Sequence, residues 1–294
     1  MKKAFFFKVL ILVLFSGNIF SQVNSGFNIF YSRSSYTLET QKLMVGQNNF
    51  KQYNLMLQIH IDPKNTGKVD QEVFIRSVKG FFPDSTSSGI LCIDLENQAY
   101  KNLYNYDINT PEFKEASALF IWMLKKVKEI RPNVKVGFYG IPFREYYTNK
   151  KNTSKLDVIL SGVDYIFPSL YTMYPDKQIG KSRNEKYLKD NLQVALEFGI
   201  RLNKPVVPFV WNIIHPSNKL YGGQLVDKNE MIQNIEFIKK FKYKNTSASG
   251  VVWWDPDSKS FSKMNKTKLD IQEQEPKYIQ SKLFQNYLDP YIKK

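Results

Sequence analysis

Short apolar runs alternate with longer amphipathic stretches along most of this 294-residue chain. Runs rich in β-branched and aromatic residues predict strands, and apolar residues spaced three or four apart predict helices. The predicted strands span residues 27–31, 55–60, 89–96, 135–140, 165–171, 205–211 and 250–254, and the predicted helices lie near 67–80, 111–130, 186–201 and 228–241. Strands that alternate with helices in this way are typical of parallel β/α architectures.

The number and spacing of the strands favour a barrel. Seven strands within one domain suit a closed ring better than an open sheet, so we predict an α/β fold, a TIM-like distorted (β/α) barrel with seven strands in a single domain. The length of the chain and its 43% hydrophobic content are sufficient for one large domain with a sizeable core. In such barrels the chemistry lies at the carboxyl ends of the strands, so we expect functional side chains there.

The N-terminus predicts export. Two lysines follow Met1, then comes an apolar run over residues 4–15 that only Lys8 interrupts, and then small and polar residues. This order is typical of a secretory signal peptide, so we expect cleavage after Ser21 and a barrel domain over residues 22–294, secreted or periplasmic. The alternative is an uncleaved membrane anchor, but the apolar run is short for a bilayer span, so we expect no stable membrane insertion.

The chain is strongly basic, with a formal net charge of +15. Removal of residues 1–21 takes away Lys2, Lys3 and Lys8 and no acid, which leaves 15 − 3 = +12. A secreted protein with this charge attracts polyanions, which include nucleic acid, anionic polysaccharide and membrane surfaces. The lysines are scattered and no nucleic-acid motif is present, so we expect the partner to be an anionic polysaccharide. We also expect the protein to be a monomer. A lysine-rich composition without functional meaning is the alternative.

Cysteine and histidine are too few to suggest a metal site. Cys92 is the only cysteine, so no intramolecular disulfide can form, and we expect it to be a small buried hydrophobic residue. The two histidines, His60 and His215, do not belong to a Cys/His cluster. Structural roles are therefore expected for both, and no metal or other cofactor is predicted.

Two carboxylates, Asp94 and Glu96, end the apolar run 89–96. Residues two apart in a strand point to the same side, so these side chains should project together from the strand end. Two close carboxylates cannot both ionise easily, so one of them should keep a proton near neutral pH. This arrangement suits acid-assisted cleavage of a glycosidic bond. The pattern Asp-x-Glu also occurs by chance, and its position at a strand end is what favours catalysis.

Aromatic residues also collect at the predicted strand ends. They are Tyr139, Tyr171, Trp211 and Trp254. Aromatic faces stack on sugar rings, and phenol groups form hydrogen bonds with sugar oxygens. Each of these residues alone is more often a core residue, but their shared position around one barrel mouth indicates a sugar-binding cleft.

Several segments occur in an order that resembles one enzyme family. They are Phe82-Pro83-Asp84, Gly89 through Glu96, Gly137-Phe138-Tyr139-Gly140-Ile141-Pro142, Phe167-Pro168-Ser169-Leu170-Tyr171, residues 205–210, residues 250–254 and residues 287–292. Together they resemble the animal and venom hyaluronidases, which are endo-hexosaminidases acting on hyaluronan, over residues 27–292. The family's fold is a distorted seven-stranded barrel, in agreement with the strand count above.

The resemblance implies a role for each matching residue. Glu96 would be the general acid, and the substrate's own 2-acetamido carbonyl would be the nucleophile in a retaining, substrate-assisted reaction. Asp94 would orient the acetamido group and stabilise its charge. Tyr171 would hydrogen-bond that group, Trp254 would wall its pocket, and Tyr139 would line the cleft.

The chain also departs from the family pattern. Leu95 replaces the usual aromatic between the two acids, Phe209 stands where a tyrosine is common, and Asp255-Pro256-Asp257 replaces a small polar loop. Phe209 and Trp211 complete the set of expected substrate-binding residues. The cysteines that brace the animal enzymes are missing. These changes leave the acid pair intact and leave the choice of polymer open.

Three functions therefore remain in competition. The first is a secreted endo-N-acetylhexosaminidase, a hyaluronoglucosaminidase-like glycoside hydrolase acting on hyaluronan or a related glycosaminoglycan. The second uses the same chemistry on chitin or peptidoglycan, although chitinase-like barrels usually carry another acid where this chain has Cys92. The third is a non-catalytic polysaccharide-binding barrel, which the altered residues around the acids suggest.

Overall fold

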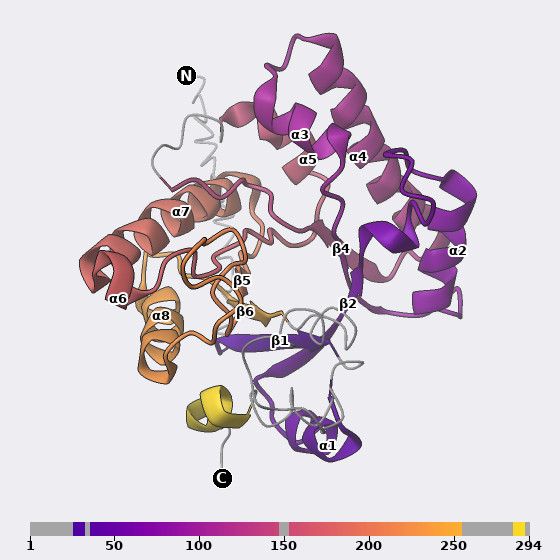
Figure 1. Ribbon diagram of the computed structural model, residues 1–294. Coiled ribbons are helices and arrows are strands. Elements are labelled where there is room, and N and C mark those ends of the chain that lie inside the picture. The colour runs from indigo at the N-terminus through magenta and orange to yellow at the C-terminus, as the bar shows by residue number, and fades with distance from the viewer. Residues whose placement is uncertain (1–25, 33–35, 147–152, 255–284, 292–294) are drawn as a thin grey trace, which may run out of the picture.

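The computed structural model describes residues 26–32, 36–146, 153–254 and 285–291, so the predicted signal peptide lies outside the described residues. A parallel sheet runs through the centre of the molecule (Figure 1). Its strands are β1 (Asn28–Ser32), β2 (Phe50–Met56), β3 (Gly89–Ile93), β4 (Val134–Phe138), β5 (Phe209–Val210) and β6 (Gly250–Trp253). They are hydrogen-bonded in the order β4-β3-β2-β1-β6-β5, and every neighbouring pair is parallel.

An extended segment over residues 165–171 joins the two ends of this sheet. On one side the Gly140 N–H donates to the Phe167 carbonyl at 2.8 Å, and on the other the Val207 N–H donates to the Ile166 carbonyl at 2.9 Å. The strand predicted over residues 165–171 therefore closes the distorted barrel, but as isolated bridges and not as a regular strand. Pro168 lies in this segment, and proline has no N–H to donate to a ladder.

Helices surround the barrel (Figure 1). They are α1 (Leu38–Val45), α2 (Gln71–Phe81), α3 (Gln98–Asn105), α4 (Pro111–Ile130), α5 (Asp157–Leu160), α6 (Asp176–Ile179), α7 (Lys181–Leu202) and α8 (Lys228–Lys240), with 3₁₀ turns η2 (Gln58–His60), η3 (Ser154–Leu156) and η4 (Asp289–Tyr291). The four predicted helices are confirmed as α2, α4, α7 and α8. Within the described residues, no helix is both long enough and apolar enough to cross a membrane.

The helix ends follow from local capping. Helix α4 has the predicted bounds because the Thr110 side chain accepts from the Phe113 N–H and Pro111 occupies the first turn. Helix α2 begins later than the predicted residue 67, since Asp70 caps it by accepting from the N–H groups of Glu72 and Val73. N-terminal caps therefore define where both helices begin.

The prediction of a strand over residues 55–60 is wrong in its position. Strand β2 ends at Met56, and residues 58–60 form the 3₁₀ turn η2, in which the His60 Nδ1 accepts from the Leu57 N–H at 3.1 Å. His60 therefore has the structural role expected of it, but in a turn. Buried residues in β2 are Phe50, Tyr53 and Met56, three apart, so the usual alternation is not visible in the sequence.

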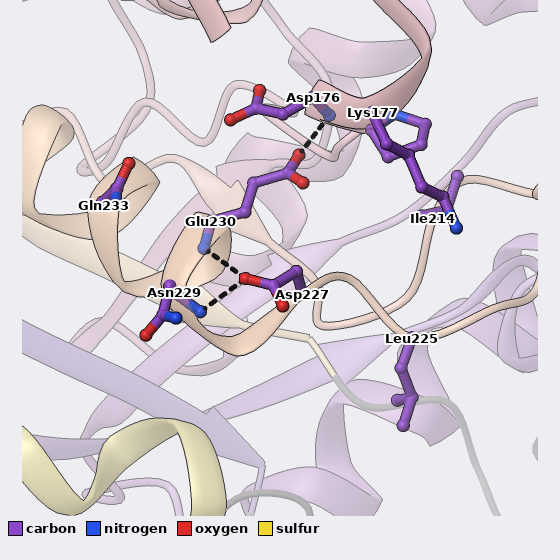
Figure 2. A pocket seen from close by; sticks show the side chains of 9 residues that line it. Asp176, Lys177, Ile214, Leu225, Asp227, Asn229, Glu230 and Gln233 are labelled. Carbon is purple, nitrogen blue, oxygen red and sulfur yellow. Dashed lines mark hydrogen bonds between the residues drawn. The ribbon is translucent and has the colours of Figure 1, made fainter. Parts of the chain in front are cut away.

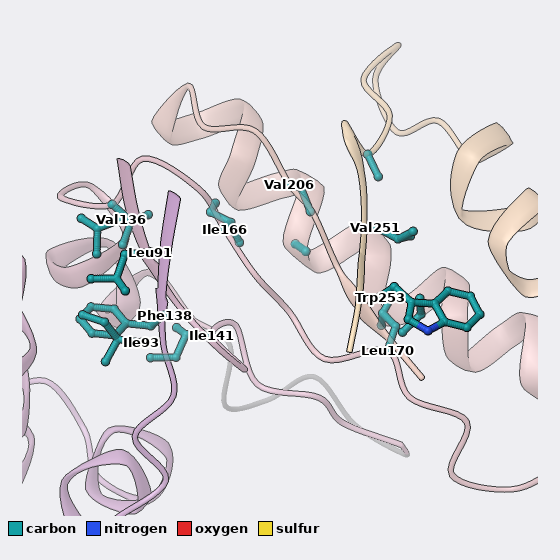
Figure 3. Close-up of a cluster of buried hydrophobic side chains, with 14 of the residues drawn as sticks. Leu91, Ile93, Val136, Phe138, Ile141, Ile166, Leu170, Val206, Val251 and Trp253 are labelled. Carbon is teal, nitrogen blue, oxygen red and sulfur yellow. The ribbon is translucent and has the colours of Figure 1, made fainter. Parts of the chain in front are cut away.

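Two layers of apolar side chains make up the core. Leu91, Ile93, Val136 and Phe138 belong to the layer between the strands and the helices (Figure 3). Cys92 belongs to the layer inside the barrel, where it packs with Phe167 and Val252, among others, as a fully buried free thiol. Side chains alternate along a strand, and Asp94 comes two residues after Cys92, so the Asp94 side chain also points towards the barrel interior.

Candidate active site

The two predicted acids lie just beyond β3, at the carboxyl end of the barrel. The Asp94 N–H donates to the Met56 carbonyl at 2.8 Å, so the sheet pairing continues one residue past the strand. Leu95 is buried between the acids, with 2% of its surface exposed. Asp94 is half-buried, whereas Glu96 is exposed and lines a cavity. The acids thus occupy the position that the strand-end rule predicted.

Both carboxyl groups hold protons more tightly than free side chains do. Burial, and then the charge of Glu96, raise the pKa of Asp94 from 3.8 to about 8. Although part of the Glu96 side chain is exposed, partial desolvation in the cavity raises the pKa of this carboxyl, while the nearby Arg144 guanidinium acts in the opposite direction. In the part of the chain that the structure describes, the Asp94 carboxylate has neither a hydrogen bond nor an ion pair. The pair therefore keeps a proton at neutral pH, mainly on Asp94 when no ligand is bound.

Three aromatic rings stack in series beside the acids. The Tyr139 and Tyr171 ring centroids are 6.0 Å apart with 29° between the planes, and those of Tyr171 and Trp254 are 5.6 Å apart with 30° between them. Trp211 packs edge-on against Trp254 with a centroid distance of 4.4 Å. The structure therefore brings together four of the aromatic residues that the sequence predicted. We call Tyr139, Tyr171 and Trp254 the aromatic wall.

The members of this group differ in exposure. Tyr139 and Trp254 are half-buried, Tyr171 is 4% exposed and Trp211 is 2% exposed. Phe209 is fully buried inside the barrel and packs edge-on against Tyr139 with ring centroids 4.9 Å apart. Phe209 therefore supports the aromatic wall from within, and its ring has no surface to offer a ligand in this structure. The Trp211 Nε1–H is buried and has no hydrogen-bond partner among the described residues.

A cavity of about 270 Å³ opens beside Glu96. It lies where α3 faces the segments that follow β3 and β4. Its lining consists of one acid, two cations and a group of aromatic and polar side chains: Glu96, Tyr100, Lys101, Tyr104, Asn105, Tyr139, Phe143, Arg144 and Ser169. Glu96 and Tyr139 are the predicted site residues that reach this space.

Arg144 and Ser169 are site residues that the sequence analysis missed. The Arg144 Nη1 donates to the Ser169 Oγ at 2.8 Å, and the Tyr139 hydroxyl donates to the same oxygen at 3.2 Å. The Arg144 guanidinium also lies 5.8 Å from the centre of the Tyr171 ring, within range of a cation–π interaction. Arg144 follows a predicted strand end, so the strand-end rule applied to charged residues could have identified it.

Two further side chains border the site. His215, for which the sequence predicts a structural role, stacks on Tyr171 with ring centroids 6.2 Å apart. Burial, and then the charge of Arg144, lower the pKa of His215 to about 4, so its ring is neutral at pH 7. Tyr53 lies inside the barrel, and its buried hydroxyl has no hydrogen-bond partner in the described part of the chain. Burial, Cys92 and Asp94 all raise the pKa of Tyr53.

A larger cavity, of about 530 Å³, lies between α6 and the start of α8 (Figure 2). Asp227 caps α8 by accepting from the N–H groups of Asn229 and Glu230 at 2.9 and 3.1 Å. Glu230 accepts from the Asp176 N–H at 3.1 Å, and burial raises its pKa to about 7. Asp227 and Glu230 thus accept hydrogen bonds from the first N–H groups of α8 and α6, respectively. The larger cavity shares no lining residue with the cavity beside Glu96.

The described residues contain no group of three or more His, Cys, Asp or Glu side chains placed to hold a metal ion. The reactive groups that the structure brings together at the barrel mouth are the carboxyl pair, the phenols and the Arg144 guanidinium.

No protein-family model matches the chain, and no curated protein matches it in sequence. Similar solved structures do exist. A crystal structure of bee venom hyaluronidase matches with a TM-score of 0.61 and 14% identity, over 90% of this chain and 98% of that one. The same bee protein in complex with a hyaluronic acid tetramer matches with a TM-score of 0.63 and 14% identity, over 92% and 99% of the two chains. At this identity the likeness establishes a shared fold, a TIM-like (β/α) barrel similar to that of bee venom hyaluronidase.

Proposed function

We propose that the protein is a secreted, endo-acting glycoside hydrolase that cleaves N-acetylhexosaminidic bonds in hyaluronan or a related glycosaminoglycan. The observation that carries this proposal is a proton-holding carboxyl pair, Asp94 and Glu96, at the mouth of a barrel and beside an aromatic wall. The fold shared with bee venom hyaluronidase supports the same reading, and so does the basic charge of the chain.

The pair can supply the acid that the reaction needs. An acetamido N–H that donates to Asp94 favours the ionised form of that carboxyl, so the shared proton passes to Glu96. Glu96 then protonates the leaving glycosidic oxygen, while the acetamido oxygen attacks the anomeric carbon from the opposite face. The bond to the leaving sugar breaks, and an oxazolinium ion forms next to the Asp94 carboxylate.

The second half of the reaction returns the pair to its starting state. The ionised Glu96 takes a proton from water, and the resulting hydroxide equivalent opens the oxazolinium ring at the anomeric carbon. Two inversions at this carbon retain its configuration. No enzyme carboxylate bonds to the sugar, which fits an Asp94 side chain that is half-buried on the interior side of the strand end.

The aromatic wall has two tasks in this mechanism. The Tyr171 phenol donates a hydrogen bond to the acetamido oxygen and holds it in line with the anomeric carbon. The Trp254 ring, which stacks on Tyr171 from one side and is half-buried, offers an apolar surface to the acetamido methyl group. Tyr171 is fixed for this role by rings on both sides, Tyr139 and Trp254.

A panel of polymers tests the proposal. Purified protein is incubated with hyaluronan, unsulfated chondroitin and chitin oligosaccharides, and new reducing ends are measured. We expect cleavage of hyaluronan or chondroitin, with the first-formed product in the β configuration by proton NMR. Cleavage of chitin alone would favour a neutral substrate, and a first-formed α product would exclude the acetamido mechanism. Binding without new reducing ends would identify a non-catalytic barrel.

A further inference from the structure

The hydroxyl group of Tyr53 is a hydrogen-bond donor inside the barrel that the structure leaves unused. Tyr53 has 1% of its surface exposed, and its buried hydroxyl has no hydrogen-bond partner within the described ranges. A polar group that is buried without a partner destabilises a fold, and native proteins contain few such groups. This hydroxyl therefore calls for a partner in another state of the protein.

Strand pairing places Tyr53 beside the strand that carries the acid pair. Leu55 of β2 lies opposite Cys92 of β3. The pairing continues to the end of both strands, where the Asp94 N–H donates to the carbonyl of the last residue of β2 at 2.8 Å. Tyr53 comes two residues before Leu55 and belongs, with Leu55 and Cys92, to the layer inside the barrel. The side chains of Tyr53 and Asp94 therefore point into the same interior space.

The Tyr53 ring is fixed in this space, but its hydroxyl proton is not. The ring packs edge-on against Phe209, with ring centroids 6.0 Å apart and 87° between the planes. A ring in a close-packed layer has little freedom to shift, whereas a phenol proton rotates about the C–O bond to suit its acceptor. The charge of Asp94 acts on the Tyr53 phenol, so this carboxyl is within electrostatic range of the hydroxyl.

Other phenols near Asp94 already have partners. The titratable groups in electrostatic contact with Asp94 are one carboxyl, one thiol and four phenols: Glu96, Cys92, Tyr53, Tyr100, Tyr139 and Tyr171. The Tyr100 hydroxyl donates to a backbone carbonyl at 3.0 Å, and the Tyr139 hydroxyl donates to a serine Oγ at 3.2 Å. The Tyr171 hydroxyl is hydrogen-bonded with Tyr139. Of these four phenols, Tyr53 is the one with a donor to spare.

We propose that Tyr53 is a positioning residue, whose hydroxyl donates to the Asp94 carboxylate when that group is ionised. A neutral Asp94 does not require this donor. When substrate binding passes the shared proton from Asp94 to Glu96, the Tyr53 hydroxyl turns to the new negative charge and stabilises it. The inference rests on the proposed function and deepens it, because the bond favours the state in which Glu96 carries the proton for the leaving oxygen.

Carbon-13 NMR of the aspartate carboxyl carbons tests this bond without any substrate. Protein labelled at these carbons is titrated through the neutral and alkaline range, and the signal that is missing from Asp94→Asn identifies Asp94. A hydrogen bond to a charged group moves a pKa by about one to two units. Tyr53→Phe keeps the ring and removes the hydroxyl, so it should raise the pKa of Asp94 by about one unit or more.

Tyr287→Phe is the matched control. Tyr287 is a buried tyrosine of the other core layer, and its hydroxyl donates to the Val226 carbonyl at 2.7 Å. This variant should leave the pKa of Asp94 unchanged. In thermal melts at pH 5, where Asp94 is neutral, Tyr53→Phe should have a Tm equal to that of wild type or higher, because it removes a hydroxyl without a partner. Tyr287→Phe should have a lower Tm, because it breaks a hydrogen bond.

Kinetics extend the test to the reaction. On a polymer that the protein cleaves, Tyr53→Phe should lower kcat by about tenfold or more, which corresponds to one pKa unit. The fall in kcat/KM that wild type shows above pH of about 8 should move to higher pH by the same shift as the NMR titration. In an Asp94→Asn background, Tyr53→Phe should change the rate by less than about threefold, because the charge that it serves is absent.

The outcomes separate this inference from the proposed function. An Asp94 pKa that is the same in Tyr53→Phe and wild type would overturn the role of Tyr53 even if hyaluronan is cleaved. An equal rise in Tyr53→Phe and Tyr287→Phe would overturn it as well. A rise that is confined to Tyr53→Phe would support the bond even in a protein that cleaves no polymer.

Discussion

Replacement of Asp94 by asparagine should stabilise the protein at neutral pH while removing most of its activity. Burial beside Glu96 raises the pKa of Asp94 from 3.8 to about 8. The folded chain therefore binds a proton that the unfolded chain releases. The stability linked to this group is fully present below pH 3.8 and is lost as the pH rises towards 8.

The size of this effect follows from the two pKa values. Each pH unit in the window is worth about 1.36 kcal/mol, so the wild-type protein should lose about 3 to 4 kcal/mol of unfolding free energy through Asp94 between pH 5 and pH 8. Asparagine has nearly the same shape and does not ionise. The difference in unfolding free energy between the Asp94→Asn variant and the wild type should therefore shift by about 3 to 4 kcal/mol in favour of the variant when the pH is raised from 5 to 8.

Urea denaturation of both proteins at pH 5 and pH 8 measures this difference directly. Asp84→Asn is the matched control, because Asp84 is exposed, and its variant should track wild type at both pH values. The rate of hyaluronan cleavage should fall by at least about 100-fold in Asp94→Asn, since the charge that faces the oxazolinium ion is lost. A stability difference that is the same at pH 5 and pH 8 would show that the pKa of Asp94 is not raised, and the proton-sharing argument would fail.

Three other predictions follow from the same geometry. The value of kcat/KM for hyaluronan should fall as the pH rises past about 8, because the carboxyl pair then loses its proton, and a pH–rate profile that is flat to pH 10 would contradict this. Tyr171→Phe should lower kcat by about 10- to 100-fold with little change in thermal stability, since the ring stack remains and one hydrogen bond is lost; unchanged kcat would remove the phenol from the mechanism. Gly137→Ala should destabilise the barrel by about 3 kcal/mol or more, because its Cβ would lie 2.3 Å from the Tyr165 carbonyl oxygen, whereas Gly80→Ala on α2 meets no atom within 4 Å and should be tolerated in the same thermal melt.

Much of the barrel could be predicted from sequence because the local signals agree with the tertiary structure. The run before Asp94 is apolar and β-branched, and it is buried on both faces in β3. Helix α4 has an apolar stripe, a threonine cap and a proline in its first turn, so both its type and its start were predictable. The rule that chemistry lies at strand ends then placed Asp94 and Glu96 correctly at the barrel mouth.

The parts that could not be predicted depend on tertiary contacts. Helix α3 has the sequence QAYKNLYN, in which Leu103 is the single fully buried side chain, so no apolar stripe indicates a helix. Its visible signal is Asn97, which caps it by accepting from the Ala99 and Tyr100 N–H groups. Without α3, the cavity beside Glu96 could not be foreseen, and neither could the meeting of Lys101 with Arg144.

Phe209 and Trp211 illustrate a second limit. The strand-end rule predicts Trp211 and the family resemblance implies Phe209, yet both are buried, Phe209 inside the barrel and Trp211 behind Trp254. An aromatic residue near a strand end can face the core or the mouth, and one residue of register decides which. Strand β5 covers two residues only. A strand this short does not show in the sequence which of its side chains face the core.

The rate of hyaluronan cleavage by Glu96→Gln, compared with wild type and with the exposed control Glu115→Gln, tests the central claim most directly. The account predicts that Glu96→Gln loses at least about 1,000-fold in rate while its fold and its binding of hyaluronan oligosaccharides are retained, because the general acid is absent. Glu115→Gln should cleave at the wild-type rate. Cleavage by Glu96→Gln at a rate close to that of wild type would contradict the assignment of Glu96 as the proton donor, and with it the proposed mechanism.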